Sequence, residues 1–174
     1  REHITAVEVR DGEVHSDVRH DLLKVAAIDR AASPGKAFIG LIRGFQLRSG
    51  AFACSCGWDS PDIMVVGAND RDMALAVNRI RFLQGGVVVF DQGRILAELP
   101  MPIFGLMSDL PLPDIAGLMD EVDAAVRTLG CSFEAPYRTL ATLAGAAIPF
   151  LRLCHEGLVD IKSGKKQTLF LPTS

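Results

Sequence analysis

The stretch that decides the fold is GVVVFDQGRILAEL, residues 86–99. It starts with an apolar run, passes through Asp91-Gln92-Gly93, and continues with a run in which apolar and polar residues alternate. Turn residues between two such runs are typical of a β-hairpin, in which two antiparallel strands are joined by a tight connection. Antiparallel sheet is therefore expected in this part of the chain.

On either side of this hairpin, other short apolar runs are bounded by residues that favour turns. Neighbouring runs of this kind predict further strands, and Asp11-Gly12 predicts a second hairpin near the start of the chain. These additional strands are predicted over residues 4–9, 22–28, 37–42, 51–53 and 63–66, and in the tail from Leu158.

Two longer segments carry apolar residues at helical spacing, with charged residues on the opposite face. The first covers residues 72–83, and Asn69 or Asp70 is placed to cap its exposed N–H groups. The second covers residues 113–129, with a proline in its first turn and a glycine just past its end. The apolar faces of both helices are expected to join the core.

Two further predictions concern helix boundaries. Ser108 or Asp109 is predicted to cap the second helix, and residues 139–147 predict a short third helix that Pro149 ends. Because the strands come in hairpins and neighbouring runs instead of alternating with helices, the expected fold class is α+β. We predict one domain over residues 1–174, with helices packed on a mixed or antiparallel sheet.

Composition limits the classes of protein to which the chain can belong. Hydrophobic residues make up 49% of its 174 residues and charged residues 22%, as in a globular domain with a proper core. The formal charge of −3 gives no electrostatic reason to bind nucleic acid, and the longest apolar stretch, residues 141–151, is too short for a membrane span. The four cysteines occur in a chain large enough to fold without disulfides, which favours a reduced, cytoplasmic protein.

Residues 50–70 contain the most varied chemistry of any connection in the chain. Cys54 and Cys56 are separated by one residue, whereas zinc knuckles and thioredoxin-like pairs need two. A nucleophilic Cys54 or Ser55 would need a histidine from distant sequence, so we interpret the two cysteines as half-buried packing residues. No two histidines share a helix face, and no metal site is expected in this chain. The histidines are His3, His15, His20 and His155.

Two interpretations of residues 58–62 are open. Asp59-Ser60-Pro61-Asp62 consists of residue types that turns require, which favours a purely structural connection. Trp58 beside Asp59, however, combines a large aromatic surface with a carboxylate. Such a pair can form a wall and a hydrogen-bond acceptor for a flat polar ligand, and this favours contact with a ligand or a nearby active site.

Seven motifs, in this order, resemble one known family. They are IMVVG (63–67), AND (68–70), DMALAVNRI (72–80), GGVVV (85–89), GRILAELP (93–100), PIFGLMSDLP (102–111) and GLVDI (157–161). Read together, they are similar to the C-terminal domain of bacterial and archaeal adenine deaminases, a branch of the amidohydrolase superfamily. The resemblance extends from about Asp21 to Ile161.

The resemblance implies a function for a larger enzyme. Adenine deaminases hydrolyse adenine to hypoxanthine and ammonia, using a pair of divalent metal ions, manganese or iron, in a (β/α)₈ barrel that precedes this domain. A barrel alone takes roughly 250 residues, so this chain cannot contain it. The implied role of this domain is to help enclose the active site of the barrel, without a catalytic residue or metal ligand of its own. The isolated domain is accordingly expected to be inactive.

The resemblance also identifies candidate site residues. The family's Ser-Ser-Val-Ala-His-Asp-Ser-His-Asn corresponds here to residues 54–62, of which Ser55, Asp59 and Ser60 keep the family pattern. Two histidines and the asparagine are replaced, and neither a tryptophan nor a proline can exchange protons or bind metal as histidine does. The residues expected to bind substrate or to form a lid are Ser55, Trp58, Asp59, Ser60 and Asp62.

Two other functions remain open at this point. The first is a module without catalytic activity that binds a purine or a similar small heterocycle, with Trp58 as the stacking surface. The second is an oligomerisation domain, for which the apolar composition is suitable. The expected partners are therefore the barrel domain, a heterocycle or a second copy of the chain.

Overall fold

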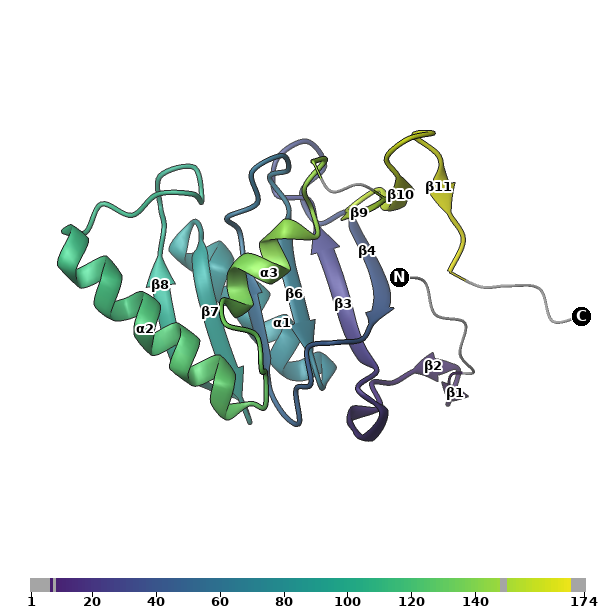
Figure 1. Ribbon diagram of the computed structural model, residues 1–174, viewed down its shortest axis with the longest axis horizontal. Coiled ribbons are helices and arrows are strands. Elements are labelled where there is room, and N and C mark those ends of the chain that lie inside the picture. The colour runs from purple at the N-terminus through teal and green to yellow at the C-terminus, as the bar shows by residue number, and fades with distance from the viewer. Residues whose placement is uncertain (1–6, 8, 148–149, 170–174) are drawn as a thin grey trace, which may run out of the picture.

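The computed structural model describes residues 7, 9–147 and 150–169. Its centre is a six-stranded sheet with the strand order β4-β3-β6-β5-β7-β8 (Figure 1). Every neighbouring pair in this sheet is antiparallel, which confirms the α+β class and decides between a mixed and an antiparallel sheet. The strands are β3 (Leu23–Ile28), β4 (Ala37–Ile42), β5 (Ala51–Cys54), β6 (Ile63–Gly67), β7 (Gly86–Asp91) and β8 (Arg94–Pro100).

Helices cover both faces of this sheet (Figure 1). α1 (Asp70–Leu83) packs on one face against β5, β6 and β7. On the other face, α2 (Leu112–Thr128) contacts β7 and β8, and α3 (Pro136–Thr142) contacts β5 and β6. The side chain of Asn69 caps α1 by accepting the N–H of Asp72 at 2.8 Å, as predicted.

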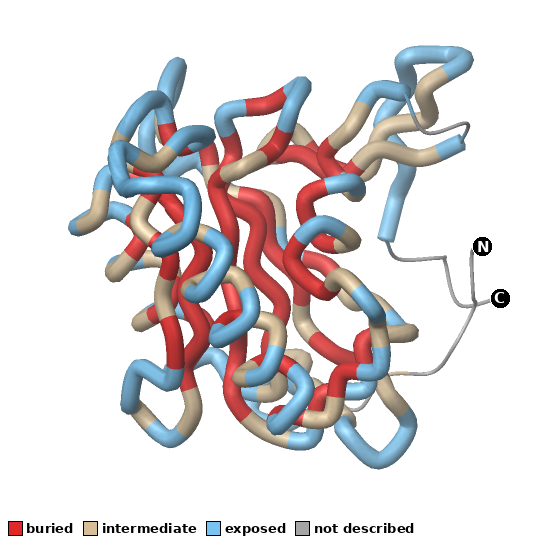
Figure 2. Tube along the Cα trace, turned by 60° about the vertical axis from the view of Figure 1, so that its left-hand side comes forward, coloured by how far each residue is buried: buried red, intermediate tan, exposed pale blue. Residues whose placement is uncertain are grey.

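Two-sided coverage explains why the central strands read as continuous apolar runs. Every residue of β5 and β6 is buried, and Figure 2 shows burial concentrated along the strands of the sheet. Successive side chains of a strand point to opposite faces. Val65 therefore joins the cluster that contains Met73 of α1, whereas Val66 joins the cluster that contains Val126 of α2.

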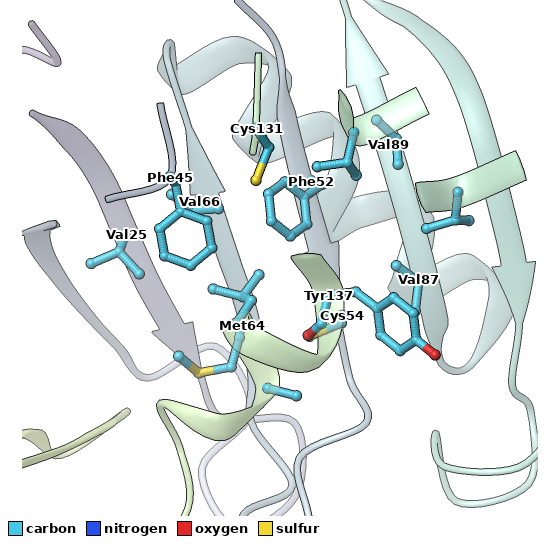
Figure 3. Close-up of a cluster of buried hydrophobic side chains, with 14 of the residues drawn as sticks. Val25, Phe45, Phe52, Cys54, Met64, Val66, Val87, Val89, Cys131 and Tyr137 are labelled. Carbon is cyan, nitrogen blue, oxygen red and sulfur yellow. The ribbon is translucent and has the colours of Figure 1, made fainter. Parts of the chain in front are cut away.

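The larger cluster lies between the sheet and the pair α2 and α3 (Figure 3). Phe52 of β5 lies at its centre, with its ring centroid 5.9 Å from that of Phe45. Phe45 in turn meets Phe133 edge to face at 5.1 Å. Cys54 is fully buried beside Tyr137, deeper than the half-buried position expected for it.

Smaller elements flank the central sheet. The hairpin predicted at Asp11-Gly12 is confirmed, and the tail contributes strands to a three-stranded sheet, β11-β10-β9. Part of the first predicted strand, residues 4–6 and 8, lies outside the described residues. No helix in the described part of the chain is long and apolar enough to cross a membrane. These elements are β1 (Val9–Arg10), β2 (Glu13–Val14), η1 (Val18–His20), β9 (Leu151–Cys154), β10 (Gly157–Asp160) and β11 (Lys166–Gln167).

The predicted bounds of the third helix and the predicted cap of the second are wrong. α3 begins at Pro136, three residues before the predicted start, because proline is well suited to the first helical turn, and it ends at Thr142 instead of residue 147. Neither Ser108 nor Asp109 caps α2: the N-cap is Pro111, which makes no side-chain hydrogen bond. The Ser108 hydroxyl instead accepts the N–H of Leu110 at 3.4 Å, within its own turn.

Candidate functional site

The connection between β5 and β6, residues 55–62, forms one side of an open cleft at the end of the sheet. The cleft has a volume of about 400 Å³. Trp58 and Phe104 line it and are 90% and 79% exposed, which is unusual for two large aromatic side chains. The residues that line the cleft are Arg30, Ala31, Gly57, Trp58, Asp59, Ser60, Pro61, Phe104 and Leu106.

The loop opposite Trp58, residues 103–107, is held by hydrogen bonds to buried groups. Ser55 is completely buried; its hydroxyl donates to the carbonyl of Gly105 at 2.8 Å and accepts the N–H of Gly86 at 2.8 Å. Arg30 also donates to the carbonyl of Phe104. Gly105 has a φ of +73°, which favours glycine, and a Cβ there would displace the Arg30 guanidinium group, whose Nη2 would lie 2.5 Å away.

Ser55 is thus turned away from the cleft, although it was expected to bind substrate or form a lid. Both of its hydrogen-bonding capacities are used on backbone groups of neighbouring segments. In the structure its contribution to the cleft is indirect, because it fixes the loop that carries Phe104. Ser60, another expected site residue, is also buried, and its hydroxyl accepts the N–H of Asp62 at 3.2 Å.

Asp59 ties the Trp58 side of the cleft to the segment after α3. Its Oδ2 accepts the N–H of Ala146 at 2.7 Å, and its carbonyl accepts a hydrogen bond from Arg152 at 3.3 Å. The Asp59 carboxylate is therefore engaged with the backbone, although the residue is exposed at the rim of the cleft. Trp58 is the one expected site residue whose side chain stands fully in the open.

Asp62 ends the loop and is completely buried. Its two oxygen atoms are both used by His155: Oδ2 accepts the backbone N–H at 2.8 Å, and Oδ1 lies 2.7 Å from the ring atom Nδ1. The second ring nitrogen, Nε2, lies 3.8 Å from Oδ2 of Asp29 and 3.6 Å from Oε1 of Glu156. Asp62 is thus part of a cluster of side chains behind the loop and does not line the cleft.

Asp29 is the second fully buried carboxylate of this cluster. Oδ1 accepts the N–H groups of Ala31 and Ala32, and Oδ2 accepts that of Ser33 at 2.6 Å. These backbone hydrogen bonds lower the pKa of Asp29 below its ordinary value, so the group is a carboxylate at neutral pH. Asp29, Asp62 and His155 each offer one donor atom within 4.8 Å of the others, a spacing that could hold a metal ion.

Inspection of the sequence missed this cluster because His155 lies 93 residues after Asp62. One signal was present, however. Asp29 directly follows the predicted strand 22–28, and Asp62 directly precedes the predicted strand 63–66. If these strands pair antiparallel, as Ile28 and Ile63 do in the structure, the two carboxylates must lie at the same edge of the sheet.

Cys54 and Cys56 are neighbours at the base of the loop, and the Cys54 thiol donates to the carbonyl of Tyr137 at 3.8 Å. The neighbouring thiol of Cys56, together with burial, raises the pKa of the Cys54 thiol, while the proximity of Cys54 lowers the pKa of Cys56. Because a buried thiol with a raised pKa is a poor nucleophile, Cys54 is unsuited to covalent catalysis. The interpretation of Cys54 as a packing residue is consistent with its place in the core.

Comparison with known proteins gives the family. Residues 1–165 match the family model described as the adenine deaminase C-terminal domain. The chain belongs to this family. This confirms the resemblance drawn from the motifs and extends it toward the start of the chain.

Curated relatives of this adenine deaminase C-terminal domain are considerably longer than the chain itself. The adenine deaminase of Methylobacterium sp. strain 4-46 is 47% identical over 152 residues, which are 87% of this chain and 27% of that protein. The adenine deaminase of Moorella thermoacetica is 43% identical over 159 residues, 91% of this chain and 27% of that protein. The adenine deaminase of Clostridium botulinum strain Langeland is 37% identical over 165 residues, which are 95% of this chain and 28% of that protein. The chain thus spans little more than a quarter of these relatives.

Removing the Ser55 hydroxyl from this adenine deaminase C-terminal domain is expected to destabilise it. Ser55→Ala leaves the carbonyl of Gly105 and the N–H of Gly86 without their buried partner, at a cost of about 1–3 kcal/mol for each group left unsatisfied. Urea unfolding followed by circular dichroism measures the loss. Ser108→Ala is the matched control, because the half-buried Ser108 makes one long local hydrogen bond; an equal loss in both variants would contradict the anchoring role.

Acid is expected to break the ion pairs of Glu156, in the turn between β9 and β10, with only a small loss of stability because these pairs are exposed. Lys166 and Lys36 both bind Glu156 and lower the pKa of its carboxyl group from 4.5 to about 2. A depressed pKa in the folded state contributes stability above the unfolded pKa, and this contribution is lost as the pH falls from about 4.5 toward 2. Carboxyl ¹³C NMR should give a Glu156 midpoint near 2, which Lys166→Met raises and Lys162→Met leaves unchanged. A midpoint near 4.5 in the parent protein would contradict these ion pairs.

Proposed function

We propose that this domain is part of an adenine-deaminase-like hydrolase that converts adenine and water to hypoxanthine and ammonia. In this proposal the cleft beside Trp58 faces the active site of a preceding barrel domain and helps to enclose it. The observation that carries the proposal is the pair Trp58 and Phe104, two strongly exposed aromatic side chains on loops fixed by hydrogen bonds. Exposed aromatic residues on fixed loops are typical of surfaces that meet a ligand or another domain.

The surroundings of Phe104 support this orientation. Residues 103–112 expose a series of large apolar side chains that a surface facing only water would not favour. Two of these residues line the cleft, and the segment continues along the chain to the start of α2. We propose that the barrel domain covers them. These side chains are Ile103, Phe104, Leu106, Met107, Leu110 and Leu112.

The chemistry divides between the two parts of the proposed enzyme. Attack of water on C6 of adenine and departure of ammonia need an activated water molecule, and a divalent metal pair, manganese or iron, would supply it in the barrel. The loop of this domain offers little for such a pair, since Asp59 and Asp62 are engaged within the domain and Trp58 and Pro61 are not ligands. Its own contribution is to exclude water and to place an aromatic surface against the purine.

The first test compares the full native gene product, purified with added manganese, with the 174-residue chain. Ammonia release from adenine is expected in the long form and absent in the short one. Trp58→Ala in the long form is expected to lower kcat/KM roughly 10-fold or more, the effect of losing one stacking contact with a base. Phe82→Ala, an exposed aromatic residue of α1, is the control and should leave kcat/KM unchanged. Activity of the short chain, or equal kcat/KM for both variants, would overturn the proposal.

One observation favours a second function, binding of a small heterocycle by this domain alone. The cleft combines the aromatic face of Trp58 with the guanidinium group of Arg30, which suits a flat ligand with hydrogen-bond acceptors. Trp58 is the single tryptophan of the chain, so its fluorescence reports directly on the cleft. Titration of the 174-residue chain with adenine and hypoxanthine tests this function, and no change at millimolar ligand would count against it.

A further inference from the structure

We propose that His155, Asp29 and Glu156 form a binding site for a divalent transition-metal ion such as Zn²⁺, with Asp62 orienting the histidine. The site lies behind the Trp58 loop, outside the cleft, and would join three segments of the chain: the end of β3, the start of β6 and the turn between β9 and β10. The proposal does not depend on the deaminase function.

The orientation of the imidazole is the first argument. Nδ1 lies 2.7 Å from the buried Oδ1 of Asp62, so this nitrogen carries a hydrogen atom and donates a hydrogen bond to the carboxylate. Histidines that bind metals almost always donate their other ring N–H to a carboxylate or carbonyl in this way. The arrangement directs Nε2 toward Asp29 and Glu156.

The surroundings of Nε2 are the second argument. Oδ2 of Asp29 and Oε1 of Glu156 lie 3.8 Å and 3.6 Å from it, beyond the distance of a normal hydrogen bond. A lone pair facing two carboxylates at this distance is unfavourable unless a cation lies between them. Around a tetrahedral Zn²⁺ with bonds of about 2.0–2.2 Å, donor atoms are separated by roughly 3.3–3.5 Å. Nε2 is thus within a few tenths of an ångström of this separation from one oxygen atom of each carboxylate.

The charge of the cluster is the third argument. Asp29 and Asp62 are two fully buried carboxylates, and an imidazolium would neutralise only one of them. On the outside, Glu156 is balanced by Lys36 and Lys166, whose side chains are about half exposed. Exposed ion pairs of this kind contribute little stability, so a divalent ion can share or displace them. Glu156 is 38% exposed, which gives the ion access from the surface.

The competing explanation is a protonated His155 that forms ion pairs with Asp29 and Asp62 without any metal. The two explanations differ in their response to added metal. With the metal-stripped 174-residue chain, we expect one saturable Zn²⁺ site by calorimetry. At 100-fold excess over Kd, the melting temperature is expected to rise by roughly 5–10 °C.

Variants separate this site from other ligands in the chain. Glu156→Gln keeps the contact between Asp62 and His155 and is expected to weaken Zn²⁺ binding 10-fold or more. His155→Ala should abolish binding. His20→Ala is the matched control: His20 pairs with Asp17 at the same 2.7 Å but is exposed, and its loss should not change the affinity.

X-ray absorption at the zinc edge identifies the donor atoms. Nitrogen and oxygen neighbours without sulfur are expected, because the proposed ligands exclude Cys54 and Cys56. A sulfur shell, unchanged affinity in Glu156→Gln, or the absence of saturable binding would each overturn the proposal. The last result would leave the protonated histidine as the explanation. None of these readouts requires adenine or deaminase activity, so failure here and failure of the proposed function are distinguishable.

Discussion

Replacing Asp62 by alanine is expected to lower the free energy of unfolding by about 2–6 kcal/mol, because two groups each lose a buried hydrogen-bond acceptor at about 1–3 kcal/mol apiece. Two groups of His155, its backbone N–H and its ring nitrogen, lose their acceptor in a site that water does not reach from the Asp62 side. Urea unfolding followed by circular dichroism measures the change. The m-value should stay constant, which would show that stability, and not compactness, has changed.

A matched pair on the surface provides the control. Asp17 and His20 make the same 2.7 Å contact, but their side chains are 36% and 70% exposed, and Asp17→Ala should cost about 1 kcal/mol, which includes the loss of the hydrogen bond from the Arg19 N–H. Asp62→Asn keeps the shape of the side chain and one acceptor oxygen. Its loss in free energy of unfolding should lie between those of the two alanine variants. If Asp62→Ala costs no more than Asp17→Ala, the buried contact with His155 does not stabilise the fold.

Phe52→Ala is expected to have a similarly large effect, about 3–5 kcal/mol. Phe52 is fully buried on β5, at the centre of the sheet, and packs against Phe45 with a centroid separation of 5.9 Å. Its removal leaves a cavity between the sheet and the helices α2 and α3, because backbone on both sides restricts collapse. The measurement is again the urea midpoint at constant m-value.

Phe82→Ala is the control for this prediction. Phe82 is exposed on α1, where the Arg79 guanidinium lies 4.8 Å from its ring centroid. Its loss should cost only about 0.5–1 kcal/mol, the range of an exposed cation–π contact. Equal losses in the free energy of unfolding for Phe52→Ala and Phe82→Ala would mean that neighbouring side chains fill the cavity, in contradiction to a closely packed core.

Most of the fold could be predicted because the signals were local. The turn at Asp91-Gln92-Gly93 and the apolar runs beside it specify a hairpin without help from the rest of the chain. The start of α1 was equally predictable, since the Asn69 side chain caps its own helix. The boundaries that were wrong depend on less specific signals: Ser108 is a suitable cap, but its hydroxyl bonds within its own turn while α2 begins at Leu112.

The site was less predictable because its contacts are long-range. The sequence indicated that Trp58 was unusual, and the structure places it in the open at a cleft. The cleft's other wall could not be predicted, because Phe104 reaches it through the hydrogen bond between Ser55 and Gly105, 50 residues apart. The pairing of Asp62 with His155 crosses 93 residues and has no local pattern at all.

That separation of 93 residues also has a consequence for the order in which the protein is made. Ribosomes add roughly 5–20 residues per second, so Asp62 is synthesised about 5–20 s before its partner His155. During this interval the nascent chain can form its early hairpins, but the Asp62 carboxylate has to stay hydrated. We expect the start of β6 to become fixed only when the β9–β10 turn has left the exit tunnel.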